Sequence, residues 1–459
     1  MSASPLENSA NDASLEQKPS LMKRVMRGSA WTIGGHAANQ IIRLGSNLLL
    51  SRLLFPEAFG LMALVFTFTT GLQMLSDLGV QPNIIQSKRG DDPTFLNTAW
   101  TLNIVRGCIL WVGACFMAFP VAQFYREPIL LWLLPVVGAT SVIEGFVSTK
   151  WATSNRKLDM QRITTLDLTM QTVGVVVMLV LAGLAWYVKA PKEVAIWALA
   201  IGCLSSSITR LILSHKYLQG ERNQFAWEKA ALVELSSFGR WVFLSTLLTF
   251  FAINASNLII PRLLGVAFFG IFSFAQNLSR LSTEIVSTLG SRILFPSYSE
   301  LVRDRPERLY PVLKRSRIVL HAFTVLACLM FVLFGQSLVG IMYDPRYADA
   351  GWILQILALG SMAATPGTTY GNVLLAQGKT FIMMALMAVQ TGIQFAAIFA
   401  GYSLGGDVGV MVGVAATGWL LYPFQAICYA RLGLWQPEVD LPVIALASGF
   451  ATLVYLRYI

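Results

Sequence analysis

Long apolar runs separated by short polar connections dominate the chain. A helix needs about 20 mainly apolar residues to cross a hydrocarbon core roughly 30 Å thick. Twelve runs meet this condition, near 29–50, 58–80, 98–122, 128–149, 164–187, 194–214, 236–260, 267–289, 318–340, 350–374, 380–403 and 408–430. A thirteenth run, at 441–456, is short for a span, so we expect it either to cross the membrane or to lie at its surface. The pattern predicts an all-α integral membrane protein with about 12 transmembrane helices.

The composition agrees with this class. Of 459 residues, 55% are hydrophobic and 13% are charged, far from the average of soluble domains. Residues 1–22 are polar and contain no apolar signal segment, so we expect a disordered cytoplasmic tail. No cysteine spacing indicates a metal site, and we predict no metal and no cofactor. The five cysteines lie inside predicted spans, as small core residues: Cys108, Cys115, Cys203, Cys328 and Cys428.

Lysine and arginine are distributed unequally between alternate connections. One set of connections holds 22 of them, with Arg210 and Arg317 counted among these, whereas the other set holds six, including Lys189 and Lys192. Short loops rich in these residues stay in the cytoplasm, so the pattern predicts a cytoplasmic N-terminus and accounts for most of the net charge of +10. Because the basic residues are dispersed and not gathered with stacking aromatics, a nucleic-acid partner is disfavoured.

An internal repeat links the two parts of the chain. Residues 31–60 align without gaps on residues 241–270 at an offset of 210, with nine identical positions. They share SNL at 46–48 and 256–258, RLL at 52–54 and 262–264, and FG at 59–60 and 269–270. Shared triplets at fixed spacing indicate a duplication. Because each half has six spans, both insert in the same orientation, with a pseudo-twofold axis along the membrane normal.

The repeat sets the expected domain organisation. We expect six-helix halves at 23–218 and 236–432, a polar cytoplasmic linker at 219–235, and a C-terminal extension at 433–459. Two parallel bundles that face each other enclose a cleft, which opens to either side when the bundles rock. This architecture favours a transporter.

The first span carries a polar face. His36, Asn39, Gln40, Arg43 and Asn47 fall within a sector about 100° wide on a helix. An arginine at the bilayer centre costs about 2.5 kcal/mol or more, so this face must look into protein or water. The sequence therefore predicts that the first span lines either a polar path or a helix contact.

Arg43 and the asparagines differ in how they fit these alternatives. For Arg43 we favour a cavity, because the equivalent residue of the second half is Ile253 and packing there needs no charge. Asn47 and Asn257 occur at equivalent positions of both halves. For them, hydrogen bonding between helices is as good an interpretation as substrate binding.

Further polar residues lie in other spans. Arg280 and Glu284 stand four residues apart in the eighth span, so they belong either to the path or to a structural ion pair. Asp77 lies near the cytoplasmic end of the second span, as a gate contact, a coupling site or a helix-end charge. The remaining candidates are Ser273, Gln276 and Asn277 in the eighth span, Asn103 and Arg106 in the third, and Ser141, Glu144 and Ser148 in the fourth.

A proline interrupts the tenth span. Pro366 and two glycines lie in the stretch SMAATPGTTYGNVLLAQGK at 361–379. Proline bends a helix and frees a backbone carbonyl, which is common where a transporter helix lines its path. A packing kink is an equally good interpretation.

The predicted path is cationic and rich in amides. Arg43, Arg106 and Arg280 would bind phosphate oxygens bidentately, which favours a substrate with phosphate and sugar and disfavours a hydrophobic cation. The titratable candidates for coupling or gating are His36, Asp77, Glu144 and Glu284, and His36 is best suited to switching near neutral pH.

Four stretches carry a family resemblance. They are GSAWTIGGHAANQIIRLGSNLLLSRLLFPEAFGLMAL, LSDLGVQPNIIQSK, NRKLDMQRI and ILFPSYSEL. From about residue 22 to 435, the chain resembles the polysaccharide flippases of the multidrug/oligosaccharidyl-lipid/polysaccharide exporter superfamily. The resemblance implies transport of an undecaprenyl-pyrophosphate-linked oligosaccharide to the outer leaflet of the bacterial inner membrane. It also implies membrane lipid as a contact, a polysaccharide polymerase and export machinery as candidate partners, and cationic cavity residues at Arg43, Arg106 and Arg280.

Two other classes remain as alternatives. A cation-coupled small-molecule or drug exporter of the same fold would need an acidic residue in the path, for which Glu144 is the best candidate. A membrane polysaccharide polymerase or ligase would need a sizeable outward loop with catalytic side chains, which the short outward connections do not provide. There is no GxxxxGK[ST] phosphate-binding loop. The sequence therefore predicts a transporter and not an enzyme.

Overall fold

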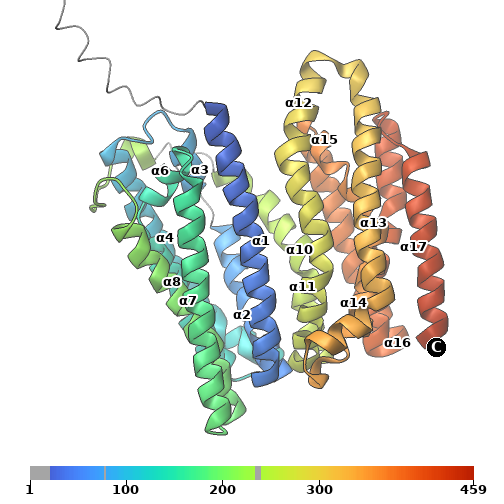
Figure 1. The fold of residues 1–459 in the computed structure, drawn as a ribbon, viewed down its shortest axis with the longest axis horizontal. Coiled ribbons are helices and arrows are strands. Elements are labelled where there is room, and N and C mark those ends of the chain that lie inside the picture. Colours follow the sequence, from blue (N-terminus) through green and yellow to red (C-terminus); the bar gives the residue numbers. More distant parts are fainter. Residues whose placement is uncertain (1–20, 77–78, 233–238, 459) are drawn as a thin grey trace, which may run out of the picture.

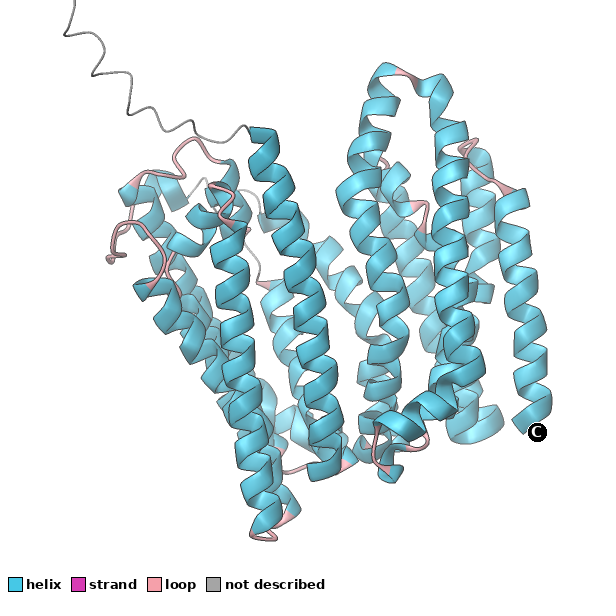
Figure 2. Ribbon diagram, viewed as in Figure 1, coloured by secondary structure: helices cyan, strands magenta, loops and turns pink. Residues whose placement is uncertain are grey.

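The computed structural model describes residues 21–76, 79–232 and 239–458. Every regular element in these ranges is a helix (Figure 2). The first half contains α1 Leu21–Leu53, α2 Pro56–Leu75, α3 Val80–Gln86, α4 Pro93–Tyr125, α5 Leu130–Gly145, α6 Lys150–Arg156, α7 Met160–Tyr187 and α8 Lys192–Lys216. The predicted tail up to residue 20 and Asp77 lie outside the described residues.

The second half forms a separate bundle beside the first (Figure 1). It contains α10 Gly239–Leu264, α11 Val266–Leu289, α12 Phe295–Asp304, α13 Leu309–Met342, α14 Ala350–Thr368, α15 Gly371–Ala376, α16 Thr380–Arg431 and α17 Pro437–Tyr458. A π-helical turn at Gly290–Leu294 joins α11 to α12. We call the end of the bundle where α1 begins and α12 projects the basic end, and the other the opposite end (Figure 1).

The membrane-spanning character is clear. In the described ranges, eight helices are long and apolar enough to cross a membrane, or nine if the bent pair α5 and α6 counts as one span. Each of the twelve predicted runs overlaps a helix, although the number twelve stays a prediction. The thirteenth run lies within α17, which is one of the eight candidate spans. Residues 441–456 therefore belong to a helix that is long and apolar enough to cross a membrane.

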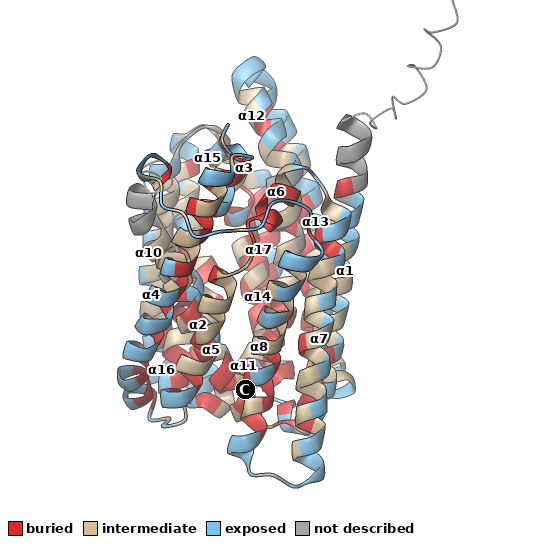
Figure 3. Cartoon of the chain, turned by 90° about the vertical axis from the view of Figure 1, so that its left-hand side faces the viewer, coloured by how far each residue is buried: buried red, intermediate tan, exposed pale blue. Residues whose placement is uncertain are grey.

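Large apolar side chains cover the outside of the bundle. Phe116 on α4, Leu326 on α13 and Phe381 on α16 are 78, 71 and 80% exposed. In Figure 3, exposed and half-buried positions line the outer helix α7, whereas buried positions gather among the helices behind it. A surface of this kind is stable in lipid and not in water.

A glycine pair separates two predicted spans that the structure joins in one long element. α16 is 52 residues long and bends at Gly405 and Gly406. Gly406 has φ of 57° and ψ of −132°, a combination that only glycine adopts without strain. After the bend the chain runs back so closely that the Gly401 and Gly409 backbones touch. The runs at 380–403 and 408–430 thus form a tight helical hairpin.

The two halves meet closely at the opposite end, where α2 packs against α11. A Cβ atom on Gly60 would collide with the carbonyl oxygen of Val266, and one on Gly270 would collide with that of Pro56. These contacts are reciprocal, because both pairs of positions differ by the offset of 210. A pseudo-twofold axis would produce this reciprocity, and the repeat itself stays a prediction.

The linker lies along the first half. Its residues 219–228, which we call the strap, have no regular structure, and the chain becomes helical at residue 229. Asn223 Nδ2 donates to Thr149 Oγ1 at 2.7 Å, and Glu228 pairs with Arg89 at 2.7 Å. The same Arg89 guanidinium, beside Asp92, holds the pKa of that carboxyl below its usual range. The strap is therefore attached to the first half by specific contacts.

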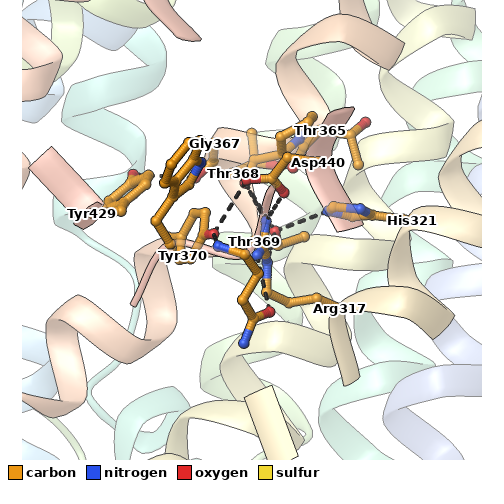
Figure 4. Close-up of polar contacts among 12 residues, drawn as sticks. Arg317, His321, Thr365, Gly367, Thr368, Thr369, Tyr370, Tyr429 and Asp440 are labelled. Atoms are coloured by element: carbon orange, nitrogen blue, oxygen red, sulfur yellow. Dashed lines mark hydrogen bonds and ion pairs between the residues drawn. The ribbon is translucent and has the colours of Figure 1, made fainter. Parts of the chain in front are cut away.

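A buried ion pair anchors α17 to the second half (Figure 4). Arg317 on α13 and Asp440 on α17 form a hydrogen-bonded ion pair, and both side chains are fully buried. The guanidinium lies 3.6 Å from the centre of the Tyr370 ring, and Tyr370 Oη donates to Asp440 Oδ2 at 3.2 Å. Arg317 Nη1 also donates to Gln436 Oε1 at 3.2 Å. Counting Arg317 with the cytoplasmic loops was wrong, because the side chain turns inward to a partner at the start of α17.

The break after Pro366 belongs to the same cluster. α14 ends at Thr368 and α15 begins at Gly371, as expected for a helix interrupted by proline. The Pro366 carbonyl accepts a hydrogen bond from Arg317 Nη2 at 3.2 Å, and Arg317 Nε donates to Thr369 Oγ1 at 3.0 Å. The packing interpretation of this kink is therefore the one that its contacts support.

Candidate functional site

A pocket lies between α1 of the first half and α11 of the second. It has a volume of about 320 Å³, and we call it the junction pocket. Gln40 Nε2 donates to Glu284 Oε2 at 2.8 Å and so bridges the two helices across this space. The lining residues are His36, Asn39, Gln40, Arg43, Glu284, Ser287 and Thr288. Four of the five polar residues singled out on the first span therefore share one pocket.

Outside the sector that lines the junction pocket, α1 carries exposed apolar side chains. Ile33, Ile41 and Leu49 are 62, 69 and 47% exposed, and they repeat every eight residues. Because eight residues turn a helix by about 80° beyond two full turns, these three side chains spread over about 160° of the circumference, outside the sector that carries Arg43. The amphipathic pattern of the first span thus separates a surface suited to lipid from the face that lines the junction pocket.

The charges in and near the junction pocket come from both halves. Arg280 lies close enough to Arg43 and Glu284 for both charges to act on it. The hydrogen bond that the described structure gives the Glu284 carboxylate comes from Gln40 of the other half. The pocket therefore combines two guanidinium groups, one lining it and one nearby, with a single carboxylate, an arrangement that suits an anionic group.

The asparagines shared by the repeats do not line this pocket. Asn257 Nδ2 donates to Asn254 Oδ1 at 3.2 Å within α10, and the buried Asn257 Oδ1 has no hydrogen-bond partner among the described residues. Asn47 is half-buried on α1. The hydrogen bond of Asn257 thus lies within one helix and does not join two helices, so neither alternative for Asn257 is tested.

A second and larger cavity lies inside the first half. Its volume is about 800 Å³, and α2, α3, α4, α5, α6 and α8 contribute to its wall. Arg106 and Glu144, which the sequence suggested for one common path, line this first-half cavity and not the junction pocket. Arg106 Nη2 donates to the Gln73 carbonyl at 2.9 Å, and its Nε donates to Ser76 Oγ at 3.0 Å. The structure thus divides the expected path into two separate spaces.

Arg210 is a residue of this cavity that the sequence interpretation missed. It was counted with the loops, but it lies on α8, and its Nη1 donates to Glu144 Oε2 at 2.8 Å. Its guanidinium also lies 4.8 Å from the centre of the Trp151 ring. The available signal was its position inside the predicted run at 194–214, since an arginine within a span is rarely without a partner.

The halves are also joined by two tyrosines at the opposite end. Tyr125 Oη, at the end of α4, donates to the Leu258 carbonyl of α10 at 2.8 Å. Tyr347 Oη donates to the Leu54 carbonyl, just after α1, at 3.0 Å. Each half thus extends a tyrosine to the first helix of the other. Together with the contact of α2 and α11, these bonds hold the opposite end closed.

We expect removal of both tyrosine hydroxyls to favour opening at this end. The double variant Tyr125→Phe/Tyr347→Phe loses two hydrogen bonds, each with a net value of about 0.5–1.5 kcal/mol. Electron spin resonance between labels at Lys189 and Ser403, in a cysteine-free background, should show longer distances than in the parent. Tyr187→Phe is the matched control, because Tyr187 is 81% exposed. An unchanged distance distribution in the double variant would contradict the assignment.

Known proteins resemble the chain along most of its length. The sequence model of a family described as "Polysaccharide biosynthesis protein" matches residues 49–351, about two thirds of the chain. The "Lipopolysaccharide biosynthesis protein WzxC" of Escherichia coli (strain K12) is 21% identical over 403 residues, which cover 86% of this chain and 78% of that protein. The "Succinoglycan biosynthesis transport protein ExoT" of Rhizobium meliloti (strain 1021) is 21% identical over 351 residues, with 76 and 68% covered.

Two solved structures share the fold. "Lipid II flippase MurJ, inward closed conformation" aligns with a TM-score of 0.64 at 12% identity, and covers 95% of this chain and 93% of its own. An inward-facing multidrug resistance MATE family transporter of the MOP superfamily also aligns with a TM-score of 0.64, at 15% identity, with 90 and 96% covered. Identities this low carry the fold and no more.

Proposed function

Because the chain belongs to the polysaccharide biosynthesis protein family, we propose that it is a flippase for a polyprenyl-pyrophosphate-linked oligosaccharide, of the kind used to build exopolysaccharide, capsule or O-antigen. The chain is a multi-span membrane protein. Relatives named for polysaccharide transport and a lipid II flippase of the same fold support this function. Relatives of these kinds also agree with a transporter and not with a polymerase or ligase.

The observation that carries the proposal is the place of Arg43. Its side chain lines a pocket whose walls come from both halves. A guanidinium keeps its charge when dehydrated and binds phosphate oxygens through two parallel hydrogen bonds. In this proposal Arg43 holds the pyrophosphate, Asn39 and Gln40 add amide contacts, and the lipid tail stays in the bilayer beside α1.

The hydrogen bond between Gln40 and Glu284 joins the two halves, and in this proposal substrate binding weakens it. An incoming pyrophosphate is repelled by the Glu284 carboxylate and attracted by Arg43, so binding would weaken the bridge. Opening of the opposite end would then require that the tyrosine contacts with Leu54 and Leu258 break. Rocking of the two halves between these states is the proposed translocation step. The membrane potential, worth about 2.3 kcal/mol per charge per 100 mV, or a coupled ion would drive it.

We place the protein in the bacterial inner membrane with the basic end in the cytoplasm. A membrane-impermeant lysine reagent applied to spheroplasts should then modify Lys189 and Lys192 but not Lys157. All three lysines are exposed in the structure. Lys150 is not used as a probe, because it is only 8% exposed and the reagent would not reach it from either side of the membrane. Mass spectrometry identifies the modified residues, and permeabilised membranes provide the positive control for Lys157. Labelling of Lys157 alone in sealed spheroplasts would reverse the proposed orientation.

A cation-coupled exporter of small molecules is the second candidate, because a multidrug transporter shares the fold. Its coupling carboxylate would be Glu144, which in this structure is paired with Arg210. The two functions differ in what accumulates when the protein is missing. Drug sensitivity of an efflux-deficient host would change only in the exporter case.

Deletion of the gene tests the proposal directly. We expect lipid-linked oligosaccharide with an intact glycan to accumulate in the inner leaflet, and we expect the wild-type chain to reverse this. If no lipid-linked sugar accumulates while resistance to small molecules falls, the exporter replaces the flippase. Accumulation of flipped but unpolymerised repeat units would instead indicate a polymerase.

A further inference from the structure

The first-half cavity has a lining that the proposed pyrophosphate site does not explain. Three charged residues line it: Arg106 on α4, Glu144 on α5 and Arg210 on α8. With two guanidinium groups and one carboxylate, the lining disfavours a cation as the ligand. At about 800 Å³ the cavity is within the size range of sites for organic ligands, and it is larger than the junction pocket.

The groups around the Glu144 pair are those that bind polyhydroxylated molecules. The carboxylate accepts hydrogen bonds, the guanidinium groups donate them, and neighbouring hydroxyls such as those of Thr140 and Ser207 do both. Arg210 Nε is buried and has no hydrogen-bond partner among the described residues, so it has a proton left to donate. The Trp151 indole adds an apolar surface to the same wall.

The position of the cavity connects it with the movement of the halves. Its α2 wall includes Phe66, which is 44% exposed, and Thr70, which is also exposed. The same helix packs against α10 and α11 of the second half. Figure 3 shows α2 beside α5 and α8 on the first-half side of the molecule. A change in the angle between the halves therefore acts on one wall of the cavity.

The strap contacts the cavity from the basic end. Ser148 and Thr149 belong to its lining, and both hydrogen-bond to Asn223 of the strap, at 2.6 and 2.7 Å. The short helices α3 and α6 line the same region, and Arg156 ties them together by donating to the Ser87 carbonyl at 2.8 Å. Polar contacts thus hold this side of the cavity in a defined shape.

We propose that the first-half cavity is a saccharide subsite, which binds sugars of the substrate's glycan while the junction pocket holds its pyrophosphate. This inference rests on the proposed flippase function and names the part of the substrate that each space recognises. Glu144 and Arg210 bind sugar hydroxyls as a hydrogen-bonded ion pair. Arg106, on the α4 wall, binds further sugar hydroxyls. The first-half cavity then recognises the length and identity of the glycan, whereas the junction pocket recognises the charge of the pyrophosphate.

The test compares two lipid-linked ligands on the purified protein in nanodiscs. One is the complete lipid-linked repeat unit extracted from the deletion strain, and the other is the same polyprenyl pyrophosphate with only its first sugar. We expect Arg106→Gln and Glu144→Gln to weaken binding of the complete unit by about tenfold or more, since a hydrogen bond to a charged group is worth at least a decade in affinity. Binding of the one-sugar lipid should stay within about twofold. Arg43→Gln should weaken both ligands equally.

Controls keep the outcomes separate. Thr140→Leu fills the cavity without removing a charge, so it should reproduce the selective loss even if Glu144→Gln is poorly folded. Thermal unfolding identifies variants whose loss is a folding defect. Equal weakening of both ligands by the cavity variants, or no weakening of either, overturns the saccharide subsite. If the wild-type chain binds neither lipid, the flippase function itself fails.

Discussion

Arg43→Ala is expected to abolish surface polysaccharide while the protein is still inserted at its normal level. The variant removes the guanidinium that lines the junction pocket, and charge-assisted hydrogen bonds of this type contribute about 1.5–3 kcal/mol each. A bidentate contact with pyrophosphate would lose two of them. The measurement is surface polysaccharide per cell in the deletion strain complemented by the variant, together with the pool of lipid-linked oligosaccharide.

Two further variants sharpen this experiment. Arg43→Lys keeps the charge but cannot bind two phosphate oxygens in parallel, so we expect intermediate export. Arg308→Ala is the matched control, because Arg308 is exposed at a helical turn of the basic end and touches neither pocket. Full export by Arg43→Ala at normal protein level would remove the junction pocket from the mechanism.

The second large effect concerns stability. Arg317→Ala or Asp440→Ala should each destabilise the protein by about 3–5 kcal/mol, because either change leaves a buried charge without its partner. Arg317→Ala also removes the guanidinium that lies over the Tyr370 ring. We expect a lower midpoint of thermal unfolding in detergent and a lower yield of folded protein.

A double variant separates the ion pair from the packing around it. Arg317→Met/Asp440→Leu replaces both charges with apolar groups, and such replacements of buried pairs are often neutral or stabilising. It should therefore recover most of the stability that either single variant loses. Lys314→Ala, which removes a more exposed pair with Glu438, should change the midpoint little. If the single variants unfold like the parent, α17 is held by other contacts.

Much of the fold followed from local patterns. Each apolar run overlaps a helix, because a run of neighbouring apolar residues long enough to cross a bilayer is visible in the sequence itself. The match to the polysaccharide biosynthesis family confirmed the resemblance inferred from short motifs. The periodicity of the first span also placed His36, Asn39, Gln40 and Arg43 on one face, and these four residues line one pocket.

Charged residues near the ends of spans were harder to interpret. Arg210 and Arg317 were assigned to loops, but both are paired inside the bundle. In sequence, an arginine one or two turns inside a helix end looks the same whether it extends to water or turns inward. The partner of Arg317 is 123 residues away, so no local pattern distinguishes the two cases.

The sequence by itself determined the membrane-spanning helical class and the family. Both depend on the length of apolar runs and on short motifs, which can be recognised from neighbouring residues in the chain. Only the tertiary structure decided that Gln40 meets Glu284 across 244 residues, that Arg106 and Arg43 line different spaces, and that α17 is anchored by Asp440. The reason is physical: a polar group in a membrane protein must find a partner, and the packing of distant helices selects which one.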